Sequence, residues 1–202
     1  MKAKFLCIYR RWVTRPGADE FLKWLESTDF FTAPASTRFH LSRPGGLVEH
    51  SIHVYYRLRS LYVFERQLKE DFAFIDLSDQ EEETIAICGL LHDICKANFY
   101  TVQMRNRKNA EGLWEQYPFY VVNDLFPYGH GEKSAHIVSS FMKLSTEESM
   151  AIRWHMGFSD NEFKAGGYSV GNAFGKFPLA VLAHIADLQA TYLDEVEEGH
   201  TS

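Results

Sequence analysis

The stretch Ile-Ala-Ile-Cys-Gly-Leu-Leu-His-Asp-Ile-Cys-Lys, residues 85–96, decides how the fold of this chain is interpreted. From Ile85 to Leu91 it is apolar on nearly every side of a helix, which is typical of a helix buried at the centre of a helical protein. Two polar residues, His92 and Asp93, interrupt the apolar pattern near its end. We expect the helix to run to about Lys96, where polar residues follow.

Capping boxes mark the starts of two helices. Ser78 and Glu81 form the S-x-x-E pattern before the buried helix, and Ser145 and Glu148 repeat it further along the chain. Apolar residues at helical spacing predict the other helices. The predicted helical segments, besides the buried one, are 18–26, 46–69, 131–144, 145–155 and 178–196. Residues 156–176 contain five glycines and are predicted to form a loop.

Residues 98–124 break the helical pattern. Aromatic and β-branched residues flank a polar stretch at 105–112, which favours a β-hairpin. The fold class that we predict is therefore all-α, a mainly helical bundle with a small β-hairpin excursion. We expect a helical extension at 1–31, a main domain at 32–196 that contains the hairpin, and a tail at 197–202.

The composition restricts the function classes. The chain has 202 residues, 46% of them hydrophobic and 24% charged, and its net charge is -6. An acidic chain has no global field for gripping duplex DNA or an anionic membrane surface. Three cysteines are too few for a disulfide framework, and no apolar stretch approaches the length of a membrane span. We expect a soluble cytoplasmic protein.

Histidines and acids recur at predicted helix ends or on apolar helix faces. The set, in chain order, is His50, His92, Asp93, His130, His155 and Asp187. A buried imidazole or carboxylate is costly unless it is paired or bound to a metal. A mixed imidazole and carboxylate set favours a divalent transition metal. A single histidine on an apolar face is more often a core residue, so the ordered set carries the prediction.

Short sequence words around these residues resemble a known family. The words are Gly-Gly-Leu-Val-Glu-His (45–50), Leu-Leu-His-Asp-Ile-Cys-Lys (90–96), Gly-His-Gly-Glu-Lys-Ser-Ala (129–135) and Ala-His-Ile-Ala-Asp (183–187). They resemble the HD-domain superfamily of metal-dependent phosphohydrolases over roughly residues 32–195. The resemblance is closest to the HD domain of bacterial 3'-5' exoribonucleases and to single-domain HD hydrolases of bacteria and their phages.

The resemblance implies a role for each matching residue. The first metal would be held by His50, His92, Asp93 and Asp187. His130 and His155 match the residues that hold a second metal, bridged by Asp93, in bimetallic members. The implied cofactor is one or two divalent transition-metal ions (Mn, Fe, Ni, Co or Zn). The catalytic residues would be Asp93, Lys96 and His184.

Two departures from the family pattern concern the substrate and the site. The family usually has glycine where Cys95 stands, and the Gly-Tyr-Pro signature of cyclic-di-GMP hydrolases is missing. The implied activity is hydrolysis of a phosphoester of a nucleotide or short oligonucleotide. A 3'-5' exoribonuclease-like activity and a non-catalytic nucleotide-binding module are the alternatives. Against the exoribonuclease, the chain is acidic overall and lacks an attached nucleic-acid-binding domain, although a partner could supply one.

The other histidines are assigned lesser roles. His53 is an alternative ligand one turn after His50; His40 contacts either substrate or solvent; His136 is structural; His200 lies in the tail. His184 either contacts substrate or packs in the core.

The hairpin is the expected source of specificity. Its aromatic residues, Phe99, Tyr100, Trp114, Tyr117 and Tyr120, can stack on a base. Its basic residues, Arg105, Arg107 and Lys108, can meet phosphates. The alternative is that the aromatic residues pack against the helices or against a second copy in a homodimer, and that the charges are merely solvated.

Overall fold

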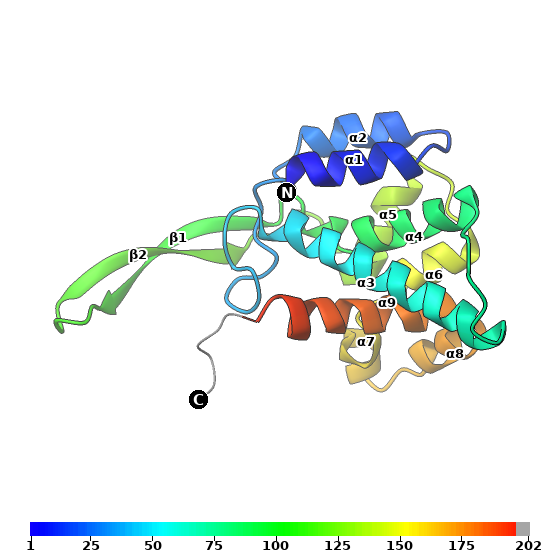
Figure 1. The fold of residues 1–202 in the computed structure, drawn as a ribbon. Coiled ribbons are helices and arrows are strands. Elements are labelled where there is room, and N and C mark those ends of the chain that lie inside the picture. The colour runs from blue at the N-terminus through cyan, green and yellow to red at the C-terminus, as the bar shows by residue number, and fades with distance from the viewer. Residues whose placement is uncertain (197–202) are drawn as a thin grey trace.

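A computed structural model describes residues 1–196 and shows a body of helices from which one long β-hairpin projects (Figure 1). The helices are α1 (Lys2–Trp12), α2 (Ala18–Glu26), α3 (Gly46–Lys69), α4 (Asp79–Leu91), α5 (His130–Ser139), α6 (Thr146–Trp154), α7 (Asn161–Lys164), α8 (Ser169–Lys176) and α9 (Pro178–Gln189). The predicted all-α fold with a small hairpin is confirmed. The predicted tail and His200 lie outside the described residues.

Helix α4 lies at the centre of the core, as its apolar sequence predicts. Ile85, Ile87 and Leu90 have no exposed surface. Burying a side chain of this size contributes about 1.5–3 kcal/mol. Both predicted capping boxes are present, since the Ser78 and Ser145 hydroxyls accept hydrogen bonds from backbone N–H groups three residues on. Helices α3 and α9 run side by side across the body (Figure 1).

Close approach of helix backbones depends on two glycines. A Cβ atom at Gly89 would lie 2.5 Å from the Cα atom of Tyr55, so α3 and α4 can pack this tightly only with glycine there. A Cβ atom at Gly131 would lie 2.1 Å from the backbone oxygen of Arg153. The close packing of α5 on α6 therefore also requires glycine. These contacts bring the polar ends of four helices together.

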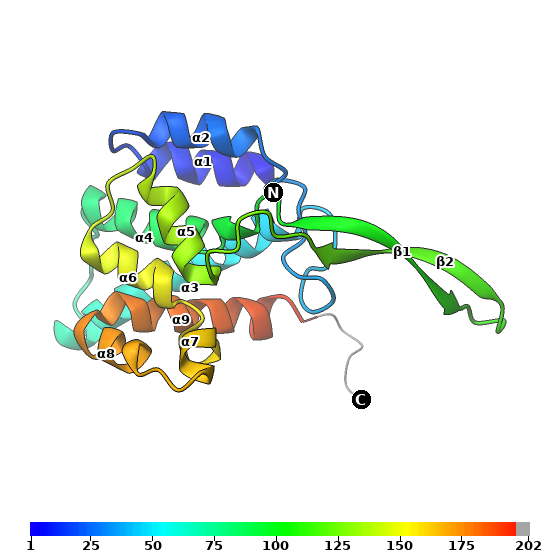
Figure 2. The ribbon, with the colours of Figure 1, turned by 180° about the vertical axis from the view of Figure 1, so that it is seen from behind.

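The N-terminal helices share the main core. Phe5, Tyr9 and Phe21 are buried in the same cluster as the residues of α4. The Tyr9 hydroxyl donates a hydrogen bond to the backbone oxygen of Ala18 at 2.9 Å, which joins α1 to α2. From behind, both helices cover the same side of the body (Figure 2).

Several helix ends differ from the sequence prediction. Helix α4 stops at Leu91, and a separate 3-10 turn, η1 (Ile94–Lys96), follows it. Helix α5 ends at Ser139 instead of near residue 144. Helix α9 ends at Gln189 and continues as a π-helical segment, η3 (Ala190–Asp194).

The prediction that residues 156–176 form a loop was wrong. This segment contains a 3-10 turn, η2 (Gly157–Ser159), and the helices α7 and α8. Val170 and Ala173 of α8 are buried against Trp154, so tertiary packing outweighs the poor helix propensity of the glycines in α8.

The hairpin pairs β1 (Tyr100–Lys108) with β2 (Trp114–Val122) in antiparallel register, with Tyr100 opposite Val122. Gly112 closes the turn with a φ of +80°, which glycine adopts without strain. Most β1 side chains are exposed. None of the described helices is long and apolar enough to cross a bilayer.

Candidate metal centre

The predicted metal ligands meet because most of them lie at the ends of helices. His50 stands in the first turns of α3, and Asp187 lies on α9. His92 and His155 cap the C-terminal ends of α4 and α6, and His130 is the first residue of α5. All six predicted ligands, His50, His92, Asp93, His130, His155 and Asp187, lie in or beside one polar cluster.

Asp93 is the centre of this cluster. Because α4 stops at Leu91, Asp93 has left the helix (φ −107°, ψ 19°), and its side chain is not restricted to the direction that a helix would impose. Its Oδ2 atom lies 3.7 Å from Nε2 of both His50 and His92. Its Oδ1 atom lies 2.8 Å from Nε2 of His130 and 3.5 Å from Nε2 of His155. One carboxylate therefore faces two different groups of imidazoles.

Asp187 completes the group on the Oδ2 side. Its Oδ1 atom lies 3.2 Å from Nε2 of His50. The Nε2 atoms of His50 and His92 are themselves 3.2 Å apart, closer than two lone pairs favour without a proton or cation between them. This side therefore offers two imidazoles and two carboxylates.

Backbone carbonyls set the orientation of two rings. Nδ1 of His92 lies 2.9 Å from the oxygen of Gly89, and Nδ1 of His155 lies 2.7 Å from the oxygen of Ile152. A carbonyl only accepts, so each Nδ1 carries the proton in the neutral ring. Each Nε2 atom is then a lone-pair donor directed at Asp93, which is the tautomer that metal-binding histidines use.

One buried atom in the cluster, Nε2 of His155, has no hydrogen-bond partner among the described residues. It faces Oδ1 of Asp93 at 3.5 Å, an oxygen whose other imidazole neighbour is Nε2 of His130 at 2.8 Å. A buried acceptor without a partner costs about 1–3 kcal/mol. Both atoms are acceptors in the states derived above, so a cation satisfies them where a hydrogen bond between them cannot. The residues present therefore fit a divalent metal.

The charge state of the imidazoles supports this fit. Burial, with the neighbouring imidazoles His155 and His50, lowers the pKa of His92 to about 3, so its lone pair is free at neutral pH. Burial also lowers the pKa of His50, but Asp187 and Glu195 outweigh it and raise the pKa to about 9. The carboxylates thus attract positive charge to the cluster, which a divalent ion supplies without protons.

Glu195 was not identified from the sequence. It follows η3, and its buried carboxylate lies 3.0 Å from Nδ1 of His50 and 2.9 Å from Nδ1 of His53. It also contacts Nδ1 of His40. A carboxylate behind a ligating histidine fixes the ring and increases its basicity. The only sequence signal was an acidic residue eight positions after Asp187 on the same predicted helix.

The remaining histidines are distributed as follows. His53, predicted as an alternative ligand, reaches Glu195 rather than Asp93. His40 is half-buried beside Glu195 and lines the cavity described below. His136 packs against Phe126 and Tyr128, away from the cluster. Nδ1 of His130 lies 3.4 Å from Sγ of Cys95, the residue that departs from the family pattern.

A cavity of about 920 Å³ opens onto the cluster. Lys96 and His184 line it with Asp93, and Tyr100 forms part of its wall. Nζ of Lys96 lies 2.5 Å from Oδ2 of Asp93. Burial lowers the pKa of Lys96, but Asp93 outweighs it and raises the pKa above its ordinary value, so the ammonium stays charged at neutral pH. Lys96 reaches the cavity from η1, and not from the face of a continuous helix.

Comparison with known proteins agrees with this geometry. Residues 47–190 match the family model of the HD domain, and the chain belongs to the HD-domain family. This match confirms the predicted superfamily. HD domains are typically metal-dependent hydrolases of phosphoesters. Searches of curated proteins and of solved structures returned no significant match. The closer likeness to exoribonucleases stays a prediction.

Proposed function

We propose that this protein hydrolyses a phosphoester of a nucleotide or short oligonucleotide with two divalent transition-metal ions. The observation that carries the proposal is the double contact of Asp93. One of its oxygens faces His50 and His92, and the other faces His130 and His155. A carboxylate placed in this way can bridge two ions, with Asp187 as a further ligand of the first.

The cavity favours a substrate with a phosphate and a flat apolar group. Lys96 supplies a fixed positive charge beside the cluster. Aromatic side chains form part of the same wall, among them Tyr100 and the exposed ring of Phe39. A cation for the phosphate and aromatic faces for a base are the two contacts that a nucleotide requires.

The chemistry divides between the metal and the chain. The chemistry that a divalent ion would supply here is a lowered pKa of bound water and neutralisation of charge on the phosphoryl oxygens. The ammonium of Lys96 adds a charge-assisted hydrogen bond to a phosphate oxygen. Nδ1 of His184 lies 2.7 Å from the backbone oxygen of His155 and donates to it, so Nε2 remains for moving a proton to the leaving group. These roles of Lys96 and His184 are part of the proposal.

Two alternative functions would give different experimental results. A non-catalytic nucleotide-binding module would bind metal and nucleotide without turnover. An exoribonuclease would release mononucleotides from the 3' end of RNA. The charged Lys96 beside the full ligand set favours turnover over binding alone.

The test combines metal content with a substrate screen. Purified protein should contain about two transition-metal ions per chain by elemental analysis. Nucleoside mono- and triphosphates, cyclic nucleotides and short RNA should be assayed with manganese, iron, nickel and magnesium. Turnover with none of them, while metal is bound, would contradict the proposal in favour of the binding module.

Asp93→Asn is the decisive variant. It removes the bridging charge at nearly constant size, so metal should be lost and kcat should fall about a thousandfold, as expected for several kcal/mol of lost stabilisation. Asp79→Asn, at the exposed start of the same helix, is the matched control and should change neither. His130→Ala should lose one of two ions, and unchanged stoichiometry would show a mononuclear centre.

A further inference from the structure

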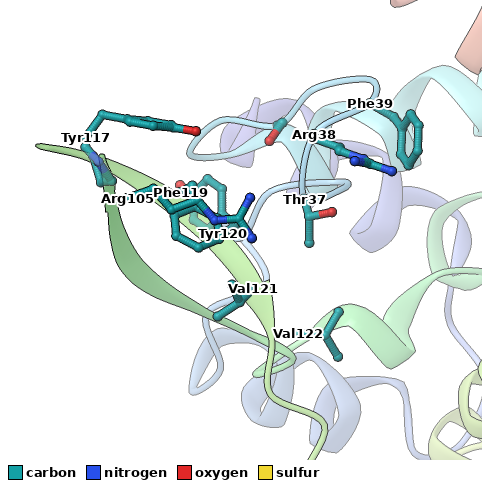
Figure 3. Close-up of a pocket in the computed structure, with 11 residues that line it drawn as sticks. Thr37, Arg38, Phe39, Arg105, Tyr117, Phe119, Tyr120, Val121 and Val122 are labelled. Carbon is teal, nitrogen blue, oxygen red and sulfur yellow. The ribbon is translucent and has the colours of Figure 1, made fainter. Parts of the chain in front are cut away.

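A second cavity of about 680 Å³ lies between the hairpin and the loop of residues 37–42. Its loop side includes Thr37, Arg38 and Phe39, and β2 supplies most of its hairpin side (Figure 3). We call it the hairpin groove. Neither the metal ligands nor His184 line it, so the proposed reaction leaves its purpose unexplained.

One face of the hairpin supplies arginines and aromatic rings in alternation. The antiparallel register places Arg105 opposite Tyr117, with Phe119 diagonally adjacent. The guanidinium of Arg105 lies 3.7 Å from the centroid of the Phe119 ring (Figure 3). Arg107 lies over Tyr117 in the same manner at 4.7 Å, one step further out. A strand side chain returns to the same face every second residue, so this surface is continuous.

The groove is locally cationic in an acidic protein. Arg38 and Arg105 line it, and no acidic residue does. Neither arginine forms an ion pair within residues 1–196, whereas Arg107 pairs with Glu115 at 2.6 Å. The net charge of the chain is -6, so two arginines without a carboxylate partner among residues 1–196, beside half-buried rings, are a local exception. Arginines with aromatic rings along a groove are the surface that binds single-stranded nucleic acid, where bases stack and phosphates meet cations.

The hairpin groove adjoins the cavity of the metal centre. The two cavities share Thr37, Arg38, Phe39, Ser42 and Val122 in their walls. A strand whose phosphoester lies beside Asp93 can therefore continue along the base of the hairpin. Together the cavities are larger than the 300–1,000 Å³ typical of a site for one small molecule.

We propose that the hairpin groove binds the single-stranded continuation of an oligonucleotide whose phosphoester is held at the metal centre. Phe119 and Tyr117 stack on bases, and Arg38 and Arg105 contact the adjacent phosphates. The substrate class within the proposed function is thus a single-stranded oligonucleotide rather than a mononucleotide. The position of the phosphoester rests on the proposed function, but the affinity of the groove for a strand does not.

Binding is measured separately from turnover. Metal-stripped wild-type protein is titrated against fluorescently labelled RNA and DNA strands in anisotropy assays, with a mononucleotide, a dinucleotide, a tetranucleotide and an octanucleotide as probes. Affinity should rise with strand length until the groove is filled, and a duplex of the same length should bind more weakly because its bases cannot stack on protein. Comparing RNA with DNA shows whether the 2'-hydroxyl contributes.

Matched variants assign the effect to the groove. Phe119→Leu should weaken octanucleotide binding about tenfold, the loss expected for one base–aromatic stack. Trp114→Leu removes an exposed ring on the opposite face and should have no effect. Arg105→Ala should reduce the slope of log affinity against log salt concentration by about 0.7, as for one phosphate contact. Lys108→Ala is the control for Arg105→Ala, because it removes one positive charge from the opposite face of the hairpin.

The outcomes separate this proposal from the proposed function. Equal octanucleotide affinity in wild type, Phe119→Leu and Arg105→Ala would overturn it, as would affinity that does not depend on strand length. A shift of these variants from dimer to monomer in sedimentation, with unchanged strand binding, would show a homodimer contact instead. Hydrolysis of bis(p-nitrophenyl) phosphate, which is too short to reach the groove, is measured on the wild type and on the controls Trp114→Leu and Lys108→Ala. It reports on the proposed function alone, so its absence would contradict that function and not the affinity of the groove for a strand.

Discussion

The polar cluster of candidate metal ligands and the hairpin differ in how their polar side chains are surrounded. In the cluster, side chains such as His92 and Asp93 are almost wholly buried, and Nε2 of His155 has no hydrogen-bond partner in the described chain. On the hairpin, Arg105 and Trp114 are exposed, and their contacts come from neighbouring strand residues. The cluster is preorganised by packing, while the hairpin has few contacts with the helical body.

This difference predicts how each region responds to change. A group in the cluster has no water to compensate for a lost contact, so a small substitution there has a large effect. A group on the hairpin exchanges its contact for water, so stability changes little and only ligand binding is affected. Variants that remove one contact at a time test whether the two regions really differ in this way.

Among the variants that compare these two regions, the largest effect is expected from Glu195→Gln, which changes the carboxylate behind His50. The amide keeps the size of the side chain but loses the charge that holds the imidazole of His50. Metal affinity should therefore fall about 10- to 100-fold, the usual cost of losing such a partner. Competition with a chromogenic chelator measures it. Asp194→Asn is the control, because that exposed carboxylate pairs with Arg57 instead; an equal loss in both variants would rule out a specific role for Glu195.

A somewhat smaller effect is expected from Gly89→Ala, which tests the packing that brings α3 to α4. The added Cβ atom meets the backbone of Tyr55, so the helices must separate. Overpacking of this kind costs about 1–3 kcal/mol, and metal affinity should fall with it because His50 and His92 lie on the two helices. Urea unfolding measures the free energy.

Gly171→Ala is the matched control for this substitution. Gly171 lies on α8 with no atom near its absent Cβ, so alanine there should be neutral or stabilise by up to about 1 kcal/mol. Equal stability of Gly89→Ala and wild type would mean that the close contact of α3 with α4 is not needed.

The smallest effect is expected on stability, where the buried carboxylate of Glu148 in the helical body is compared with the exposed carboxylate of Glu115 in the hairpin. Burial raises the pKa of Glu148, but hydrogen bonds from Arg15, the backbone of Ser145 and Thr84 outweigh it and lower the pKa below its ordinary value of 4.5. Its ionised form therefore stabilises the fold at neutral pH, and this contribution disappears as the pH falls below about 4.5. Glu148→Gln should cost about 1–2 kcal/mol at pH 7 and progressively less in acid.

Glu115→Gln is the matched variant on the hairpin. Its ion pair with Arg107 is exposed, and pairs of this kind contribute less than about 1 kcal/mol. Thermal unfolding of both variants between pH 3 and about pH 7 should show a pH-dependent difference from wild type only for Glu148→Gln. A similar pH dependence in both would mean that burial does not separate the two regions.

Local sequence signals predicted the parts of the fold that local physics controls. The capping boxes of α4 and α6 were predicted from two residues each, because both partners of the hydrogen bonds lie within one turn. The apolar run Ile85–Leu91 predicted the central helix for a similar reason. The candidate ligands were found from their order along the chain and from the family resemblance, not from helical periodicity.

Long-range packing explains what the sequence did not predict. Glu195 pairs with a histidine 145 positions earlier, and no local pattern reports such a contact. Helix α8 has two glycines, so its stability depends on burying Val170 against Trp154, which lies on a different helix. The end of α4 at Leu91 was also missed, because the sequence pattern predicted a helix that continues to about Lys96.

The order of the ligands along the chain has a consequence for biosynthesis. His50 and His92 leave the ribosome well before Asp187, by roughly ten seconds at usual rates of elongation. A nascent chain that lacks α9 holds an incomplete set of donors and an uncovered face of α3. Docking of α9 therefore covers that face of α3 and brings Asp187 to His50 in the same event, so the full set of donors is present only after residue 187 has been synthesised.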